Sequence, residues 1–191
     1  MESLPNGIQY RHWPVDDAKA CVLLAHGLAE HTGRYERVAA RFNERGMAVV
    51  GPDHIGHGAS PGVRVYLKAF SEYFEPMQAL RAHIDDWYPG RPVFLMGHSM
   101  GGLISAHLLL ISQAAFQGAM LSGPAFHAVD PAPAPLMLIG RLLRYVLPKL
   151  GMVSLDANGV SRDPAVVADY IADPLVYNGK ITTGLGIEML D

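Results

Sequence analysis

Cysteine is almost absent from this chain of 191 residues, which contains only Cys21. A single thiol excludes an internal disulfide framework and fits a reducing compartment. Long apolar runs are missing too: the longest, residues 136–140, is ended by Arg141 and is far shorter than the ~20 residues that span a membrane. The N-terminus lacks the basic start and apolar run of a secretory signal peptide, so we expect a cytoplasmic protein.

Runs of one charge sign are absent as well. The formal net charge is −3, and no cluster of Lys and Arg is long enough to indicate nucleic-acid binding. No group of residues has the spacing of metal ligands and no phosphate-binding loop is present, so we expect neither a metal nor another cofactor. Half of the residues are hydrophobic, which is enough to bury the core of one domain.

What the chain does contain is an alternation of short apolar runs with segments of helical periodicity. The runs typical of strands buried on both faces are 21–25, 47–50, 92–96 and 118–121, with a looser candidate edge strand at 8–13. Helical spacing covers 35–45, 70–87 and 100–112. This order predicts an α/β fold in which a mostly parallel sheet carries helices on both faces.

The alternation stops at Gly123-Pro124. Prolines follow at positions 131, 133 and 135, then one more helical segment at about 136–147 and a polar stretch rich in turn residues. We therefore predict that residues 1–126 form the N-terminal part of a core. We expect residues 127–191 to lie over the sheet as a cap and not to continue it.

The strongest chemical signal is the G-x-S-x-G pattern of residues 97–102, between a predicted strand and a predicted helix. A sharp strand-to-helix turn would hold Ser99 in a strained conformation with its hydroxyl exposed, and Gly97 and Gly101 would keep side chains out of the crowded turn. The following helix directs its positive end at the site, which favours developing negative charge. We expect Ser99 to be a catalytic nucleophile and His98 to belong to its supporting loop.

A second signal follows the first buried strand, where His26-Gly27-Leu28 begins a loop. Acyl transfer needs two backbone N–H groups directed at the oxyanion of the tetrahedral intermediate. In this architecture one donor is the residue after the nucleophile, here Met100, and the other lies in this early loop, here Leu28. His26 and Gly27 would shape that loop.

Together these motifs resemble the monoacylglycerol lipase group of α/β-hydrolases. The motifs that carry the resemblance are residues 26–31, 34–35, 53–60 and 97–102, with 161–164 and 173–176 similar to that family's cap region. The resemblance implies that Ser99 is the nucleophile, that Leu28 and Met100 form the oxyanion hole, and that residues 127–185 cover an acyl pocket. It implies a lipid ester substrate such as a monoacylglycerol.

The chain departs from that family after the cap. In that family the triad acid and histidine follow two further core strands, whereas this chain has no strand-like apolar run followed by a Gly-x-x-Asp pattern after residue 123. We therefore expect this chain to lack the C-terminal part of the fold, which a partner chain would have to supply. Loss of the triad histidine costs on the order of 10⁶ in kcat in a serine protease, so we expect the isolated chain to be nearly inactive. We also expect it to self-associate through an open sheet edge.

The residues present offer poor replacements for the missing triad members. Of nine histidines, only His127 follows the last predicted core strand, and it precedes any plausible acid, which breaks the usual order Ser, acid, His. Asp53 ends a strand near the site, but we expect it to accept hydrogen bonds from the loop at residues 56–60.

The motifs are compatible with other functions. The same chemistry serves lysophospholipases, general esterases, acyltransferases and peptidases, and a truncated chain could bind a lipid or a partner without catalysis. Epoxide hydrolases and dehalogenases carry Asp where this chain has Ser99. The apolar segment 136–147, with Arg141 and Arg144 on one face, either rests on a lipid surface or only packs on the core.

Overall fold

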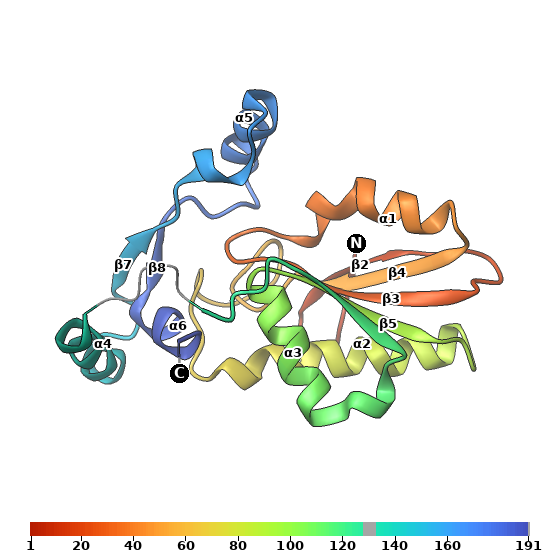
Figure 1. The fold of residues 1–191 in the computed structure, drawn as a ribbon, viewed down its shortest axis with the longest axis horizontal. Helices are drawn as coiled ribbons and strands as arrows, with labels where there is room; N and C mark the ends of the chain where they lie inside the picture. Colours follow the sequence, from red (N-terminus) through yellow and green to blue (C-terminus); the bar gives the residue numbers. More distant parts are fainter. Residues whose placement is uncertain (128–132, 191) are drawn as a thin grey trace.

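The computed structural model describes residues 1–127 and 133–190 (Figure 1). Six strands form one sheet in the spatial order β1-β2-β4-β3-β5-β6. Their bounds are β1 Glu2–Ser3, β2 Gln9–Trp13, β3 Ala20–Ala25, β4 Met47–Pro52, β5 Val93–His98 and β6 Gly118–Ser122. Strands β4, β3, β5 and β6 run parallel, and β1 and β2 are antiparallel. The mostly parallel sheet predicted from the sequence is confirmed.

Helices cover both faces of this sheet, as predicted. Helix α1 (Glu36–Asn43) lies on one face, and α2 (Phe74–Trp87) and α3 (Met100–Ser112) lie on the other (Figure 1). Short 3-10 helices precede or follow them: η1 (Thr32–Tyr35), η2 (Phe70–Tyr73) and η3 (Gln113–Ala115). Because strand side chains alternate between faces, the fully buried β3 contributes Leu23 to the core beneath α2 and α3, and Leu24 to the smaller core beneath α1.

The segment predicted as an edge strand is not at the edge. Strand β2 pairs with β4 on one side and with β1 on the other, so the two residues of β1 cover it. A tight turn returns the chain between them, with the Gly7 N–H donating to the Leu4 carbonyl at 2.9 Å. A two-residue strand is too short to show the alternation by which strands are recognised in a sequence.

The described residues after β6 form a separate group of elements. They are α4 (Ala134–Val146), β7 (Gly151–Ser154), η4 (Ala157–Val160), α5 (Pro164–Ala172), β8 (Lys180–Thr182) and α6 (Thr183–Glu188). Strands β7 and β8 pair only with each other in the described structure, as an antiparallel sheet that the sequence did not predict. In Figure 1 this group, which we call the cap, lies beside the carboxyl ends of the parallel strands. None of the helices in the described ranges combines the length and apolar character needed to cross a membrane.

Strand register sets the position of the site. Ala25 of β3 pairs with Gly97 of β5, so the loop that begins at His26 and the turn at Ser99 leave the same edge of the sheet side by side. His98 in turn pairs with Ser122 of β6. In open parallel sheets ligands bind outside the carboxyl ends of the strands, and both predicted motifs are there.

Candidate active site

Ser99 joins β5 to α3 in a strained conformation. Its φ of 51° and ψ of −117° lie in a region that costs a residue with a side chain about 1–3 kcal/mol. Backbone hydrogen bonds hold it there: the Ser99 N–H donates to the Ser122 carbonyl at 3.0 Å, and the Ser99 carbonyl accepts from Gly102 and Ala125 at 2.9 and 3.0 Å. The turn therefore has the geometry that the motif predicts.

Two glycines allow β5, α3 and β3 to approach closely at this turn. A Cβ atom on Gly97 would lie 2.3 Å from the Gly101 carbonyl oxygen. A Cβ on Gly101 would lie 2.0 Å from the Ala25 carbonyl oxygen. Only glycine fits at either position without moving the backbone.

The side chain of Ser99 is half-buried and lines a cavity. No hydrogen bond to its hydroxyl is formed by the part of the chain that the structure describes. The neighbouring His98 is exposed, and its Nδ1 lies 3.0 Å from the Ser122 carbonyl oxygen. His127 lines the same cavity without a hydrogen bond to Ser99, so neither histidine is placed as its base.

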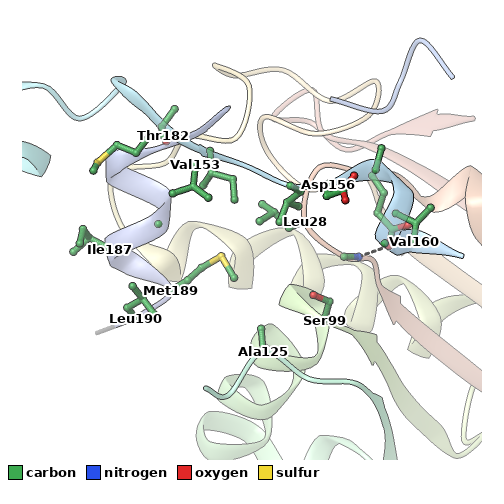
Figure 2. A pocket seen from close by; sticks show the side chains of 18 of the residues that line it. Leu28, Ser99, Ala125, Val153, Asp156, Val160, Thr182, Ile187, Met189 and Leu190 are labelled. Atoms are coloured by element: carbon green, nitrogen blue, oxygen red, sulfur yellow. Dashed lines mark hydrogen bonds between the residues drawn. The ribbon is translucent and has the colours of Figure 1, made fainter. Parts of the chain in front are cut away.

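The loop after β3 brings Leu28 to the same cavity. Figure 2 shows Leu28 and Ser99 near each other in its wall. The Leu28 N–H forms no hydrogen bond within the described residues, and the N–H of Met100 belongs to the first turn of α3, where helix donors lack partners in the helix. The Leu28 N–H is thus free at a residue that lines the cavity, and the Met100 N–H directly follows Ser99; an oxyanion hole needs two such donors.

Glu30 ties this loop together, a role that the sequence analysis missed. Its carboxylate accepts hydrogen bonds from the Gly27 N–H at 2.6 Å, the Tyr35 hydroxyl at 2.6 Å and the Arg34 Nε at 2.9 Å. Burial and the nearby Glu30 charge raise the pKa of Tyr35, so its hydroxyl stays a donor. In the sequence, the one trace of these contacts is that Glu30 lies four residues before Arg34 and five before Tyr35, ahead of the helix predicted at 35–45.

The cap is attached to the same loop. His31 Nε2 and Asp173 Oδ2 are 2.8 Å apart, and the Tyr177 N–H donates to the Ala29 carbonyl at 2.8 Å. Although burial opposes it, hydrogen bonds from His31 and from the Leu175 N–H lower the pKa of Asp173. These contacts join residues more than 140 positions apart, and no local pattern in the sequence predicts them.

Asp53 takes the structural role that was predicted for it. Its Oδ2 accepts from the Ala59 N–H at 2.9 Å, within the predicted loop. Its Oδ1 accepts from the Thr32 N–H at 2.9 Å and from the Thr32 hydroxyl. Burial raises the pKa of the carboxyl, but the hydrogen bonds from Ala59 and Thr32 outweigh that effect and lower it.

The cavity that contains Ser99 has a volume of about 810 Å³ and a mainly apolar wall. Leu28, Ser99 and Ala125 line one part of it with neighbouring residues of the core, and much of the remaining wall comes from the cap (Figure 2). The cap residues labelled there are Val153, Asp156, Val160, Thr182, Ile187, Met189 and Leu190. A cavity of this size holds a small molecule with a long apolar part.

No metal centre is found in residues 1–127 and 133–190, where no three His, Cys, Asp or Glu side chains are grouped so as to hold an ion. Two other histidines pack against aromatic rings: His12 stacks on Trp87 with ring centroids 4.4 Å apart, and His107 packs against Phe74.

The sheet order, the covering helices and the strained serine turn define an α/β-hydrolase. The chain belongs to the family Hydrolase_4, described as serine aminopeptidase, S33, whose model matches residues 16–191. The resemblance to monoacylglycerol lipases inferred from the motifs is confirmed by the sequence and structure comparisons that follow.

Two curated relatives illustrate the similarity. The monoacylglycerol lipase of Mycolicibacterium smegmatis is 41% identical over 179 residues, which cover 93% of this chain and 64% of that protein. The monoglyceride lipase of Rattus norvegicus is 33% identical over 183 residues, which cover 95% of this chain and 60% of that protein. The chain thus spans somewhat less than two thirds of the length of these relatives.

The solved structure of Paleococcus ferrophilus monoacylglycerol lipase superposes with a TM-score of 0.83 at 30% identity, and the match covers 96% of this chain and 69% of that one. A soluble variant of monoglyceride lipase from Saccharomyces cerevisiae, solved with a substrate analog, superposes with a TM-score of 0.78 at 24% identity. The α/β-hydrolase fold of this chain is therefore established.

Proposed function

We propose that this chain carries the nucleophile and the acyl pocket of a serine ester hydrolase that cleaves monoacylglycerol or a similar lipid ester. The observation that carries the proposal is the placement of Ser99, strained and half-buried, in the wall of a mainly apolar cavity of about 810 Å³. An acyl chain fits the apolar wall formed by the cap and brings its ester carbonyl to the hydroxyl.

The chemistry would proceed through an acyl-enzyme. Ser99 Oγ attacks the ester carbonyl, and the N–H groups of Leu28 and Met100 bind the oxyanion. The alcohol leaves with a proton, and water then hydrolyses the acyl-serine ester. Because no described histidine is hydrogen-bonded to Ser99, we propose that a segment outside this chain supplies the triad acid and histidine. The greater length of the relatives supports this proposal.

The edge of the main sheet supports the same proposal. Strand β6 pairs with β5, and no other described strand adjoins it. Two apolar side chains of the neighbouring α3, Leu110 and Ile111, are 85% and 57% exposed. A parallel strand and helix from the complementing segment would bury both features. Sedimentation velocity and urea unfolding of the isolated chain test this proposal. The isolated chain should self-associate, whereas a monomer that unfolds cooperatively would contradict the need for a complementing segment.

We further propose that the cap touches a lipid surface. Five apolar side chains of α4 are at least half exposed: Leu138, Ile139, Leu142, Tyr145 and Val146. In Figure 1, α4 lies on the side of the cap that faces away from the main sheet. A substrate that leaves a membrane would enter the cavity past this surface.

Liposome flotation tests the membrane contact. Leu142→Asp should reduce binding to phosphatidylcholine vesicles, whereas Leu110→Asp, an equally drastic change at an exposed leucine of α3, should not. Equal binding by wild type and Leu142→Asp would mean that α4 only covers the core.

The substrate class is tested by hydrolysis, with the missing segment restored. We would join this chain to the residues that follow the matched region in the M. smegmatis relative, and offer monoacylglycerols, lysophospholipids, short-chain esters and aminopeptidase substrates. Cleavage of monoacylglycerols above the others is expected. Peptide cleavage would favour the activity named in the family description, and no cleavage by a folded chimera would favour a non-catalytic binding role.

A further inference from the structure

His26 lies directly beneath the loop that carries the Leu28 N–H. Its side chain is fully buried, and both of its ring nitrogens have partners. Nδ1 lies 2.7 Å from the carbonyl oxygen of Gly27, and Nε2 accepts from the backbone N–H of His54 at 2.9 Å. A buried imidazole with two backbone partners is held in one orientation.

These two bonds determine where the ring proton is. The His54 N–H can only donate, so Nε2 of His26 must present its lone pair. The single proton of the neutral ring is then on Nδ1, where it donates to the Gly27 carbonyl. A charged ring would place a second N–H against the N–H of His54. Burial lowers the pKa of His26, in keeping with a neutral ring.

The Gly27 carbonyl belongs to the same planar peptide unit as the Leu28 N–H. The described peptide bonds are all trans, so within that unit the N–H points opposite to the C=O. A carbonyl held down toward His26 therefore turns the Leu28 N–H up and away from it. On the other side of Gly27, the N–H donates to Glu30, which prevents the glycine from rotating alone.

We propose that His26 is a positioning residue: through its Nδ1–H it fixes the Gly27–Leu28 peptide plane so that the Leu28 N–H faces the substrate oxyanion. The proposal rests on the ester hydrolase function proposed above. It assigns to His26 a defined tautomer and a defined effect on the transition state, which general packing beneath the loop would not require.

The neighbouring histidine provides a matched control. His54 is also fully buried, and its ring centroid is 4.2 Å from that of His26. Neither of its ring nitrogens has a hydrogen-bond partner. Burial lowers the pKa of His54 and also that of the adjacent His57, to about 3, so all three rings are neutral. Replacing His54 by leucine therefore makes the same substitution beside His26 without removing a hydrogen bond to the Gly27 carbonyl.

Hydrogen exchange measured by mass spectrometry tests the positioning without requiring activity. In the chain joined to its complementing segment, we would compare wild type, His26→Leu, His54→Leu and His26→Asn, whose side-chain amide places a donor near the position of Nδ1. In His26→Leu the Gly27 amide should exchange about tenfold faster, as expected when one hydrogen bond of the loop is lost. His54→Leu should match the wild type in this segment, and His26→Asn should restore most of its protection.

Ester hydrolysis by the same variants in the complemented protein links the loop to catalysis. His26→Leu should lower kcat by about 10²–10³ with KM unchanged, the effect of losing one oxyanion donor, and His26→Asn should recover part of it. Equal exchange at Gly27 in His26→Leu and His54→Leu would overturn the positioning role. A wild-type protein that hydrolyses no ester would instead contradict the proposed function, while the exchange data would still decide the role of His26.

Discussion

Substitution of Gly101 by alanine should strongly destabilise the chain. The added Cβ would lie 2.0 Å from the Ala25 carbonyl oxygen and 2.5 Å from that of His26. Real Cβ contacts are essentially never shorter than 3.0 Å, so α3 must move away from β3 by about 1 Å, and both obstacles are rigid backbone. Overpacking typically costs about 1–3 kcal/mol, and this clash belongs at or above the upper end. Of a total stability of about 5–15 kcal/mol, that is a large share.

Urea denaturation of the chain joined to its complementing segment, followed by tryptophan fluorescence, measures the effect as a lower urea midpoint, and the melting temperature of the same protein should fall by about 6–12 °C. Gly159→Ala is the control, because no atom lies within 4 Å of the added Cβ and the backbone there is unstrained; its stability should change by less than about 0.5 kcal/mol. A displaced α3 also moves Ser99, so any residual activity should fall about 10²-fold. A Gly101→Ala variant with the urea midpoint of the wild type would refute this picture of the turn.

Three further predictions concern buried side chains. Tyr35→Phe removes a 2.6 Å hydrogen bond to the Glu30 carboxylate and should lower the free energy of unfolding by about 1.5–3 kcal/mol, measured in urea. The pKa of Asp53 is lower in the folded chain than in the unfolded one, so its stabilising contribution is complete above about pH 4 and is lost as the pH falls further. Asp53→Asn should therefore be less stable than wild type at pH 7, and the difference should shrink at pH 3; a difference independent of pH would contradict this. Burial raises the pKa of Cys21 to about 11, so iodoacetamide at pH 8 should modify it only as fast as the chain unfolds, and rapid labelling of the folded chain would show that β3 is accessible.

The main sheet and its helices could be read from the sequence because each depends on a local pattern. The run at residues 21–25 became β3, buried on both faces, and helix α3 has the predicted bounds, Met100–Ser112. The serine turn was equally predictable, because Gly97 and Gly101 stand at fixed positions on either side of Ser99. Both glycines are required by close contacts, within the turn or with the adjacent strand β3.

The remaining features depend on contacts that sequence patterns do not record. Strand β1 has only two residues, and the β7–β8 pair joins segments separated by α5, with a register shift between Gly151 and Val153. The bond between His31 and Asp173 depends on how the cap is placed. The sequence marked His26 as part of the loop, but the tautomer that we infer for it depends on the N–H of His54, 28 residues away.

The proposed role of Ser99 is tested most directly by a fluorophosphonate probe and intact-mass measurement. The protein is the chain joined to the segment that follows the matched region in the M. smegmatis relative, with Ser99→Ala in the same background as control. We predict one probe adduct on the wild-type protein and none on Ser99→Ala. A folded wild-type protein that stays unlabelled, or a Ser99→Ala variant that still carries the adduct, would contradict Ser99 as the nucleophile.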